Sequence, residues 1–322
     1  MSWEFDELIN KARRAEDVGD LWVAHNTLKK AIELDPADSQ TWIWYADVCN
    51  QLEQFAEAIH AFEHVLKLEP TFAGAYSGLA TALVETGRLH EAERALSESI
   101  RLRPTSSRLV LLADVQTRLG QNAKAETSLR QALRLDPNDD EALFNLALLI
   151  RDQDVEESIQ LFLRALEVDP HYAAAYRELG WTYLRKRSLD AAERALENAL
   201  RLDQNDARAH LYLGHSLVER GKIPDALNEF DRARLLSPLW ALPMLLKGRL
   251  LEDDGRILEA EAAFRMAVEM SPSDADCLAE LGRHLLSSRK VAEAQRLLEE
   301  ALRLQPGHRT ALEAMARLSA DT

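Results

Sequence analysis

The pair of side chains best suited to metal chemistry in this sequence is His60 and His64. Their i, i+4 spacing would place both rings on one face of a helix. In the H-E-x-x-H zinc motif a glutamate follows the first histidine, but here that residue is Ala61, and no third ligand is evident nearby. We therefore interpret the two histidines as an exposed pair on the outer side of a helix, and we predict no metal ion and no other cofactor.

Catalytic groups of other kinds are also missing from the sequence. Cys49 and Cys277 lie far apart within apolar helical patterns, where buried thiols are more common than a disulfide or a metal site. No glycine-rich phosphate loop occurs, and no nucleophile with a readable base partner stands out. Four aspartates directly precede expected helices and are typical N-caps; these are Asp38, Asp139, Asp206 and Asp274. We predict that the chain is not an enzyme.

The stretch from residue 73 to residue 104 shows which elements position these side chains. Its first half carries an apolar stripe with the spacing of an amphipathic helix, formed by Tyr76, Leu79, Ala80 and Leu83. Gly87 then interrupts the helical pattern, and a second stripe consists of Leu89, Ala92, Leu96, Ser99 and Ile100. Pro104 ends the second helix because proline lacks the N–H that a helix needs. The stretch therefore predicts a helix-turn-helix unit.

The same unit recurs along the whole chain. Its stop positions are Pro36, Pro70, Pro104, Pro137, Pro170, Gln204, Pro238, Pro272 and Pro306, so that successive steps are 33 or 34 residues. A small residue recurs on each first helix, at Ala12, Ala46, Ala80, Ala113, Ala147, Gly180, Gly214, Gly248 and Gly282. Small side chains let two helix axes approach closely, and large residues then fill the space around them.

This pattern resembles the tetratricopeptide repeat, on the basis of Tyr76, Leu79, Ala80, Gly87, Leu89, Ala92, Leu96 and Pro104. The resemblance implies an all-α, right-handed superhelical α-solenoid of nine helix-turn-helix units and a C-terminal capping helix. We expect a single solenoid over residues 1–322. Its repeats lie near 5–38, 39–72, 73–105, 106–138, 139–172, 173–206, 207–240, 241–274 and 275–308, and the capping helix spans 309–319.

Composition limits the classes of partner. The 322 residues carry a formal net charge of −15, and this disfavours nucleic acid, whose binding depends on clustered Lys and Arg. No apolar run approaches the 18 or so residues that a membrane span requires, so we predict no membrane insertion. No secretory signal is readable at the N-terminus, and the predicted location is cytoplasmic.

The resemblance further implies a binding groove, because the first helices of tetratricopeptide repeats line a concave surface. The expected groove residues are Trp44, Asn50, Phe144, Asn145, Arg151, Arg177, Trp181, Arg185, Tyr212, His215, Arg249 and Arg283. Cations and aromatic residues collect in the later repeats, where they would suit a protein or peptide with an acidic or C-terminal carboxylate segment. In the alternative interpretation, Arg249 and Arg283 pair with Glu219, Glu252 or Asp253 and bind nothing else.

The eighth repeat has additional apolar residues. Its first helix is apolar on more than one face, through Trp240, Leu242, Leu245 and Leu246, preceded by Leu239. Such a surface marks contact with a partner or with a second copy, or else burial by a neighbouring repeat.

Three functions remain open from the sequence. The favoured one is a non-catalytic scaffold or adaptor that binds an extended or helical segment of another protein. The second is a substrate-recruiting subunit of a separate enzyme, such as a protein glycosyltransferase. The third is a self-assembling structural protein, that is, a homo-oligomer.

Overall fold

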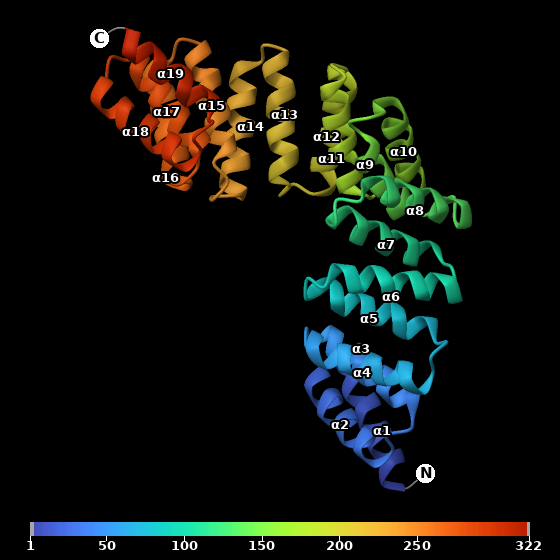
Figure 1. The fold of residues 1–322 in the computed structure, drawn as a ribbon. Helices are drawn as coiled ribbons and strands as arrows, with labels where there is room; N and C mark the ends of the chain where they lie inside the picture. The colour runs from blue at the N-terminus through green and yellow to red at the C-terminus, as the bar shows by residue number, and fades with distance from the viewer. Residues whose placement is uncertain (1–2, 321–322) are drawn as a thin grey trace. The chain divides into compact units, whose positions relative to one another are not determined.

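A computed structural model describes residues 3–320, which form helices and no strand (Figure 1). The chain divides into two compact units, Met1–Val168 and Asp169–Thr322. The helices of the first unit are α1 (Trp3–Asp17), α2 (Leu21–Leu34), α3 (Ser39–Gln51), α4 (Phe55–Leu68), α5 (Ala73–Glu85), α6 (Leu89–Leu102), α7 (Ser106–Arg118), α8 (Asn122–Leu135), α9 (Asp140–Ile150) and α10 (Val155–Val168). Those of the second unit are α11 (Ala173–Arg185), α12 (Leu189–Leu202), α13 (Ala207–Glu219), α14 (Ile223–Leu236), α15 (Leu242–Asp253), α16 (Ile257–Met270), α17 (Ala275–Ser287), α18 (Val291–Leu304) and α19 (Arg309–Ala320).

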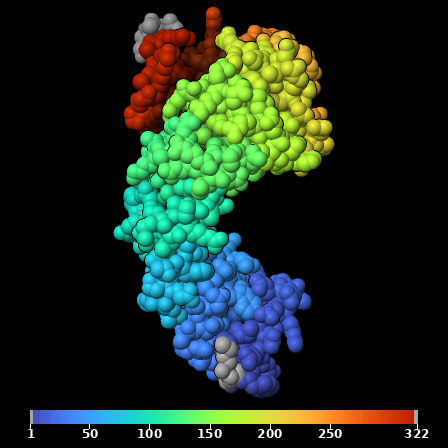
Figure 2. Space-filling model, turned by 90° about the vertical axis from the view of Figure 1, so that its right-hand side faces the viewer, coloured from blue at the N-terminus to red at the C-terminus, as the bar shows by residue number. Residues whose placement is uncertain are grey.

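Each odd-numbered helix from α1 to α17 packs against the helix that follows it, and within a unit each pair packs against the next pair. Figure 2 shows neighbouring repeats of the first unit in direct contact along the stack. The last helix, α19, covers α17 and α18. The all-α fold of nine helix pairs and a final helix is thus confirmed for residues 3–320. A single solenoid over residues 1–322 stays a prediction.

Among the described residues, the turn between paired helices contains one residue with a left-handed backbone in every repeat but the fifth. Gly19, Gly87, Gly120, Gly221 and Gly255 take this role, with φ between 72° and 76°. At the equivalent turns of three other repeats φ is 59° and the residue is not glycine; these are Glu53, Arg187 and Arg289. A side chain makes this conformation costly, so the three turns hold backbone strain that the glycine turns avoid.

The N-caps follow the sequence prediction. Asp38 accepts a hydrogen bond from the Thr41 N–H, and Asp139 accepts one from the Ala142 N–H. Asp206 and Asp274 cap α13 and α17 in the same way. These carboxylates satisfy backbone donors that would otherwise lack partners at the start of a helix.

Each unit has its core between the paired helices. Large side chains that are at most 2% exposed fill it in every repeat: Leu28, Phe62, Leu96, Leu129, Phe162, Leu196, Phe230, Phe264 and Leu298. The small residue of each first helix lies beneath them. A Cβ added to Gly248 would lie 2.6 Å from Phe264, and one added to Gly180 would lie 2.6 Å from Leu196. Among the described residues, no helix combines the length and the apolar character needed to cross a membrane.

Candidate functional site

Three predicted groove residues of the second unit form an aromatic cluster, namely Trp181 on α11 with Tyr212 and His215 on α13. The Trp181 and Tyr212 rings are stacked, with centroids 4.6 Å apart and planes inclined by 22°. The His215 ring meets Trp181 edge-on at 6.3 Å. All three side chains are partly exposed, and α11 and α13 are in direct contact. The sequence prediction therefore identified residues from two repeats that the fold brings together.

Arg177 lies on the same helix as Trp181 but is already engaged. Its guanidinium donates to Asp206 at 2.8 Å and to Glu178 at 3.1 Å, and only 19% of the side chain is exposed. Burial alone would lower the pKa of Arg177, yet the bonds to Asp206 and Glu178 raise it overall. Arg177 therefore joins two successive repeats. Arg185, at the end of α11, is exposed.

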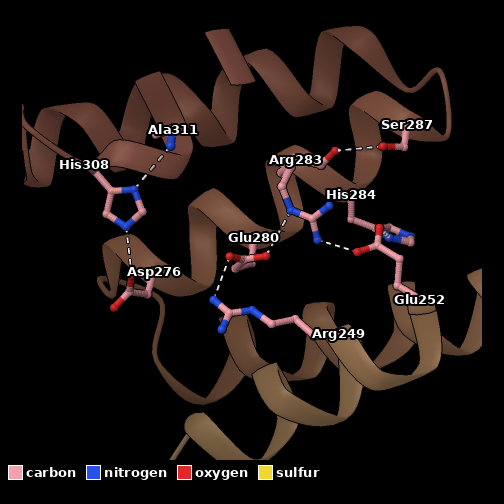
Figure 3. Close-up of polar contacts among 9 residues, drawn as sticks. All are labelled: Arg249, Glu252, Asp276, Glu280, Arg283, His284, Ser287, His308 and Ala311. Carbon is pink, nitrogen blue, oxygen red and sulfur yellow. Dashed lines mark hydrogen bonds and ion pairs between the residues drawn. The ribbon is translucent and has the colours of Figure 1, made fainter. Parts of the chain in front are cut away.

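Arg249 and Arg283 belong to a partly buried network with Glu252, Glu280 and His284, on α15 and α17 (Figure 3). Glu280 and His284 are buried in it, whereas the Arg249 side chain is 47% exposed. Arg249 donates to Glu280 at 2.7 Å, and Arg283 donates to Glu280 at 3.1 Å and also to Glu252. His284 Nδ1 lies 2.8 Å from a carboxylate oxygen of Glu252. Figure 3 shows the Arg283 guanidinium pointing between the two carboxylates.

The network determines the charge state of its members. Desolvation would raise the pKa of Glu252, but hydrogen bonds from Arg283 and His284 outweigh it and hold the pKa below the ordinary value. Both arginines are thus neutralised by carboxylates of the chain. For Arg283 the partner Glu252 is one that the sequence suggested, whereas Arg249 binds Glu280, which the sequence did not indicate.

A cavity of about 370 Å³ lies at the end of the second unit, between α17, α18 and α19. Arg283 contributes one wall, Arg289 and Arg317 add further guanidinium groups, and Leu286 and Val291 supply apolar surface. Sequence analysis did not propose Arg289 or Arg317 as binding residues. Arg289 lies in the turn between α17 and α18, and the last helix, which carries Arg317, was treated as a cap only. The strained turn at Arg289 was the available signal, since a non-glycine residue occupies a glycine position there.

The predicted residues of the first unit are more dispersed. Trp44 donates to Glu16 at 2.9 Å, and the Asn50 amide lies 3.4 Å from the Gly78 carbonyl. Asn145 lines a cavity of about 400 Å³ between α7, α8 and α9, together with Asp114.

Two further residues of this group lie on or just after α9. The Phe144 ring packs edge-on against Phe162 at 5.8 Å, and Arg151 is partly buried directly after the last residue of α9. Among the predicted residues of the first unit, Asn145 thus lines a cavity, whereas the Phe144 ring packs against a core residue.

The apolar surface predicted in the eighth repeat is smaller than expected. Leu245 is 5% exposed and lies in the core, so it offers no contact surface. Trp240 and Leu246 pack partly against the same core. Leu242 is 39% exposed and Leu239 is 84% exposed. Burial by the repeat itself therefore accounts for Leu245, because the first turn of α15 packs inward on more than one face.

His60 and His64, the histidine pair considered as a metal site, differ in environment. His60 is exposed, whereas the His64 ring stacks on Trp42, with centroids 4.2 Å apart. Desolvation, together with the charges of Lys67 and His60, lowers the pKa of His64. The description of both rings as exposed was wrong for His64, because Trp42 of the preceding helix covers it.

Both cysteines are free and buried, as predicted, and burial raises the pKa of each thiol to about 12. Cys49 also belongs to a group of three side chains whose metal-ligating atoms lie within 4.8 Å of one another, the other two being His25 and Glu57. Sequence analysis missed this group, since its members come from three helices.

Two sequence profiles of the tetratricopeptide repeat match this chain. One matches residues 50–114 and 251–318, and the other matches 9–59, 110–173, 148–207, 177–238 and 211–275. The chain belongs to the tetratricopeptide repeat family. Repeats of this family are generally non-catalytic and bind proteins or peptides.

Individual tetratricopeptide repeat proteins are similar over part of their length. The TPR repeat-containing protein YpiA of Bacillus subtilis is 29% identical over 173 residues, which are 51% of this chain and 41% of YpiA. The probable UDP-N-acetylglucosamine–peptide N-acetylglucosaminyltransferase SPINDLY of Hordeum vulgare is 26% identical, over 46% of this chain and 17% of that protein. The chain thus spans less than half the length of these curated relatives.

Among solved structures, that of yeast Tom70 has a TM-score of 0.58 at 17% identity, and the match covers 97% of this chain and 88% of Tom70. At this identity the likeness concerns the fold. The relatives support the tetratricopeptide fold. The class of partner has to be inferred from the surface residues of this chain.

Proposed function

We propose that this protein is a non-catalytic scaffold that binds an extended or helical segment of a partner protein along the first helices of its second unit. The observation that carries the proposal is the partly exposed aromatic cluster of Trp181, Tyr212 and His215. Large rigid rings provide contact area at a low cost in conformational entropy, and they are enriched among the residues that dominate binding energy. The Trp181–Tyr212 stack also fixes both rings before a ligand arrives.

The charges in the groove favour this anchor over a purely ionic one. Arg177, Arg249 and Arg283 each hold carboxylates of the chain at 2.7–3.1 Å or closer. An acidic partner segment would have to replace those carboxylates, and removing one member of a buried pair leaves the other without compensation. We therefore assign primary recognition to an apolar or aromatic side chain of the partner. An acidic or C-terminal carboxylate group of the partner would instead suit Arg289 and Arg317, which line the cavity together with Glu313.

One alternative function has specific support. The similarity to the SPINDLY glycosyltransferase covers only repeats, so this chain could recruit substrates for a catalyst on a separate chain. In that case the same groove would bind the substrate protein, and the bound segment would carry the modification. Self-association through Leu239 and Leu242 is the other alternative, and sedimentation at several concentrations tests it directly.

The proposal is tested with a displayed random-peptide library selected on the wild-type chain, followed by titration of the selected peptides. Trp181→Ala and Tyr212→Ala should each weaken binding by roughly 30-fold, the loss of about 2 kcal/mol typical of a central interface residue. The matched control is Trp22→Ala, because Trp22 is a tryptophan that is 55% exposed on an outer helix, α2. Equal affinity of the wild type and both cluster variants would exclude this groove as the binding site.

A further inference from the structure

Three side chains with metal-ligating atoms converge in the first unit, away from the aromatic cluster. They are His25 on α2, Cys49 on α3 and Glu57 on α4, and one donor atom from each lies within 4.8 Å of the others. His25 Nε2 is 3.3 Å from a carboxylate oxygen of Glu57. We propose that His25, Cys49 and Glu57 bind one divalent zinc-type ion that links the first two repeats.

The donor set suits zinc. Thiolate, imidazole and carboxylate are the protein ligands that Zn²⁺ prefers, with bonds of about 2.0–2.3 Å. In a tetrahedron such bonds separate the ligand atoms by roughly 3.3–3.6 Å. The His25–Glu57 distance already lies in this range, and the thiol lies within 4.8 Å of both partners, so a small side-chain movement completes the set. One thiolate and one carboxylate also balance the charge of a divalent ion, so the bound state buries no net charge.

A fourth ligand is available on two sides. The Tyr45 hydroxyl lies 3.2 Å from His25 Nε2 and donates to Glu57, so it borders the same space. The Glu57 side chain is 42% exposed, and a water molecule can therefore reach the ion from that side. Lys29 lies 3.5 Å from Glu57, but its side chain is 51% exposed and can turn into solvent.

Packing alone does not explain these residue types. In the third repeat the positions of Tyr45 and Cys49 are taken by Leu79 and Leu83, and in the ninth by Leu281 and Leu285. All four leucines are at most 8% exposed, so the repeat accepts plain hydrocarbon at both positions.

The position of His25 likewise holds Ile59, 7% exposed, one repeat later. His25 is itself 4% exposed, and its Nε2 is the ring nitrogen that faces Glu57 and Tyr45. Imidazole, phenol and thiol together in one core need a reason that hydrophobic packing does not supply. A bound ion supplies that reason, because it uses the lone pairs that face one another.

Cobalt titration of the untagged, full-length, reduced chain tests the site. Co²⁺ enters zinc sites, and a thiolate ligand adds an intense charge-transfer band in the near ultraviolet. We expect one equivalent of Co²⁺ to give this band and one equivalent of Zn²⁺ to abolish it. Cys49→Ser should lose the band, and His25→Gln should weaken Zn²⁺ binding at least tenfold in competition with a coloured chelator.

The matched control is Cys277→Ser, since Cys277 is an equally buried thiol in the second unit. It should leave both the band and the zinc affinity unchanged. Circular dichroism establishes that each variant is folded. If the wild type gives no thiolate band, or if Cys49→Ser keeps it, the proposed site is wrong. Neither outcome affects the peptide titrations on Trp181 and Tyr212.

Discussion

The two units use the same repeat but differ in the small residue at the closest contact between its two helices. In the first unit the small residue of each first helix is alanine, and in the second unit it is glycine throughout. The residues are Ala12, Ala46, Ala80, Ala113 and Ala147, and then Gly180, Gly214, Gly248 and Gly282. An added Cβ at any of these four glycines would come within 2.6–2.8 Å of a core leucine or phenylalanine. Glycine lowers helix propensity by about 1 kcal/mol relative to alanine, so the second unit accepts weaker helices in return for closer packing.

The largest effect should come from removing the large residue above a glycine. Phe264→Ala should destabilise the second unit by about 3–5 kcal/mol, because Gly248 beneath it has no side chain with which to fill the cavity. Leu96→Ala, in the first unit above Ala80, should cost about 2–4 kcal/mol. Hydrogen exchange with mass spectrometry reads the two units separately within the full chain. If the two variants lost equal hydrogen-exchange protection in their respective units, the small residue would not determine the size of the cavity.

The next largest effect should come from replacing a glycine of the second unit with the alanine that the first unit uses at that position. Gly248→Ala should destabilise the second unit by up to about 2 kcal/mol, because overpacking costs about 1–3 kcal/mol and the gain in helix propensity offsets about 1 kcal/mol of it. Denaturant unfolding monitored by circular dichroism measures the change. Adding Phe264→Leu to Gly248→Ala should recover part of the loss by freeing space for the new methyl group. If Gly248→Ala alone stabilised the second unit, α15 and α16 would be able to move apart without loss of packing energy.

The two units should differ in how strongly their stability depends on pH in the acid range. The pKa of Glu252 in the folded chain lies below its ordinary value, so its contribution is full above an unfolded pKa of about 4.5 and is lost as the pH falls through the lower, folded pKa. Glu252→Gln should therefore lower stability at pH 7 and converge with the wild type toward pH 3. Thermal unfolding across this range provides the measurement.

Glu157→Gln is the counterpart in the first unit. Its pKa is lowered chiefly by Arg130, but the Glu157 side chain is 37% exposed, compared with 18% for Glu252. Solvent weakens such a pair, so the pH dependence should change much less. A larger change for Glu157→Gln than for Glu252→Gln would show that the lower exposure of Glu252 does not strengthen its ion pairs.

The smallest effect concerns the turns, which both units share. Glu53→Gly and Arg289→Gly should each stabilise the chain by about 0.5–1 kcal/mol, because φ is 59° at both positions. Gly87→Ala is the reverse control and should destabilise by a similar amount. Differential scanning calorimetry detects these shifts. If Arg289→Gly stabilises and also weakens the binding of selected peptides, the Arg289 side chain contributes to the cavity as proposed.

Much of the fold could be predicted from the sequence, because the signals are local and repeat. Pro104 and its equivalents end helices, Asp139 and Asp206 cap them, and the alternation of small and large residues identifies the faces that pack. The aromatic cluster was also within reach, since Trp181 and His215 lie one repeat apart at equivalent positions.

Side-chain pairing was harder to predict. Arg249 could approach several acidic residues on three helices, and its actual partner, Glu280, depends on the rotamers of both side chains. The group around Cys49 was out of reach for another reason. Its members are separated by 8, 24 and 32 residues, and each taken alone resembles an ordinary core or surface residue.

Asp206 makes two kinds of contact at once. One carboxylate oxygen accepts from the Arg208 and Ala209 N–H groups at the start of α13, and the other accepts from Arg177 of the preceding repeat. The usual description of repeat proteins adds the energy intrinsic to a repeat to the energy between neighbours. The Asp206 side chain contributes to both energies, so no substitution of Asp206 changes one without the other. Fraying of the first turn of α13 should therefore release Arg177 as well, and the two repeats should lose their structure together as one cooperative element.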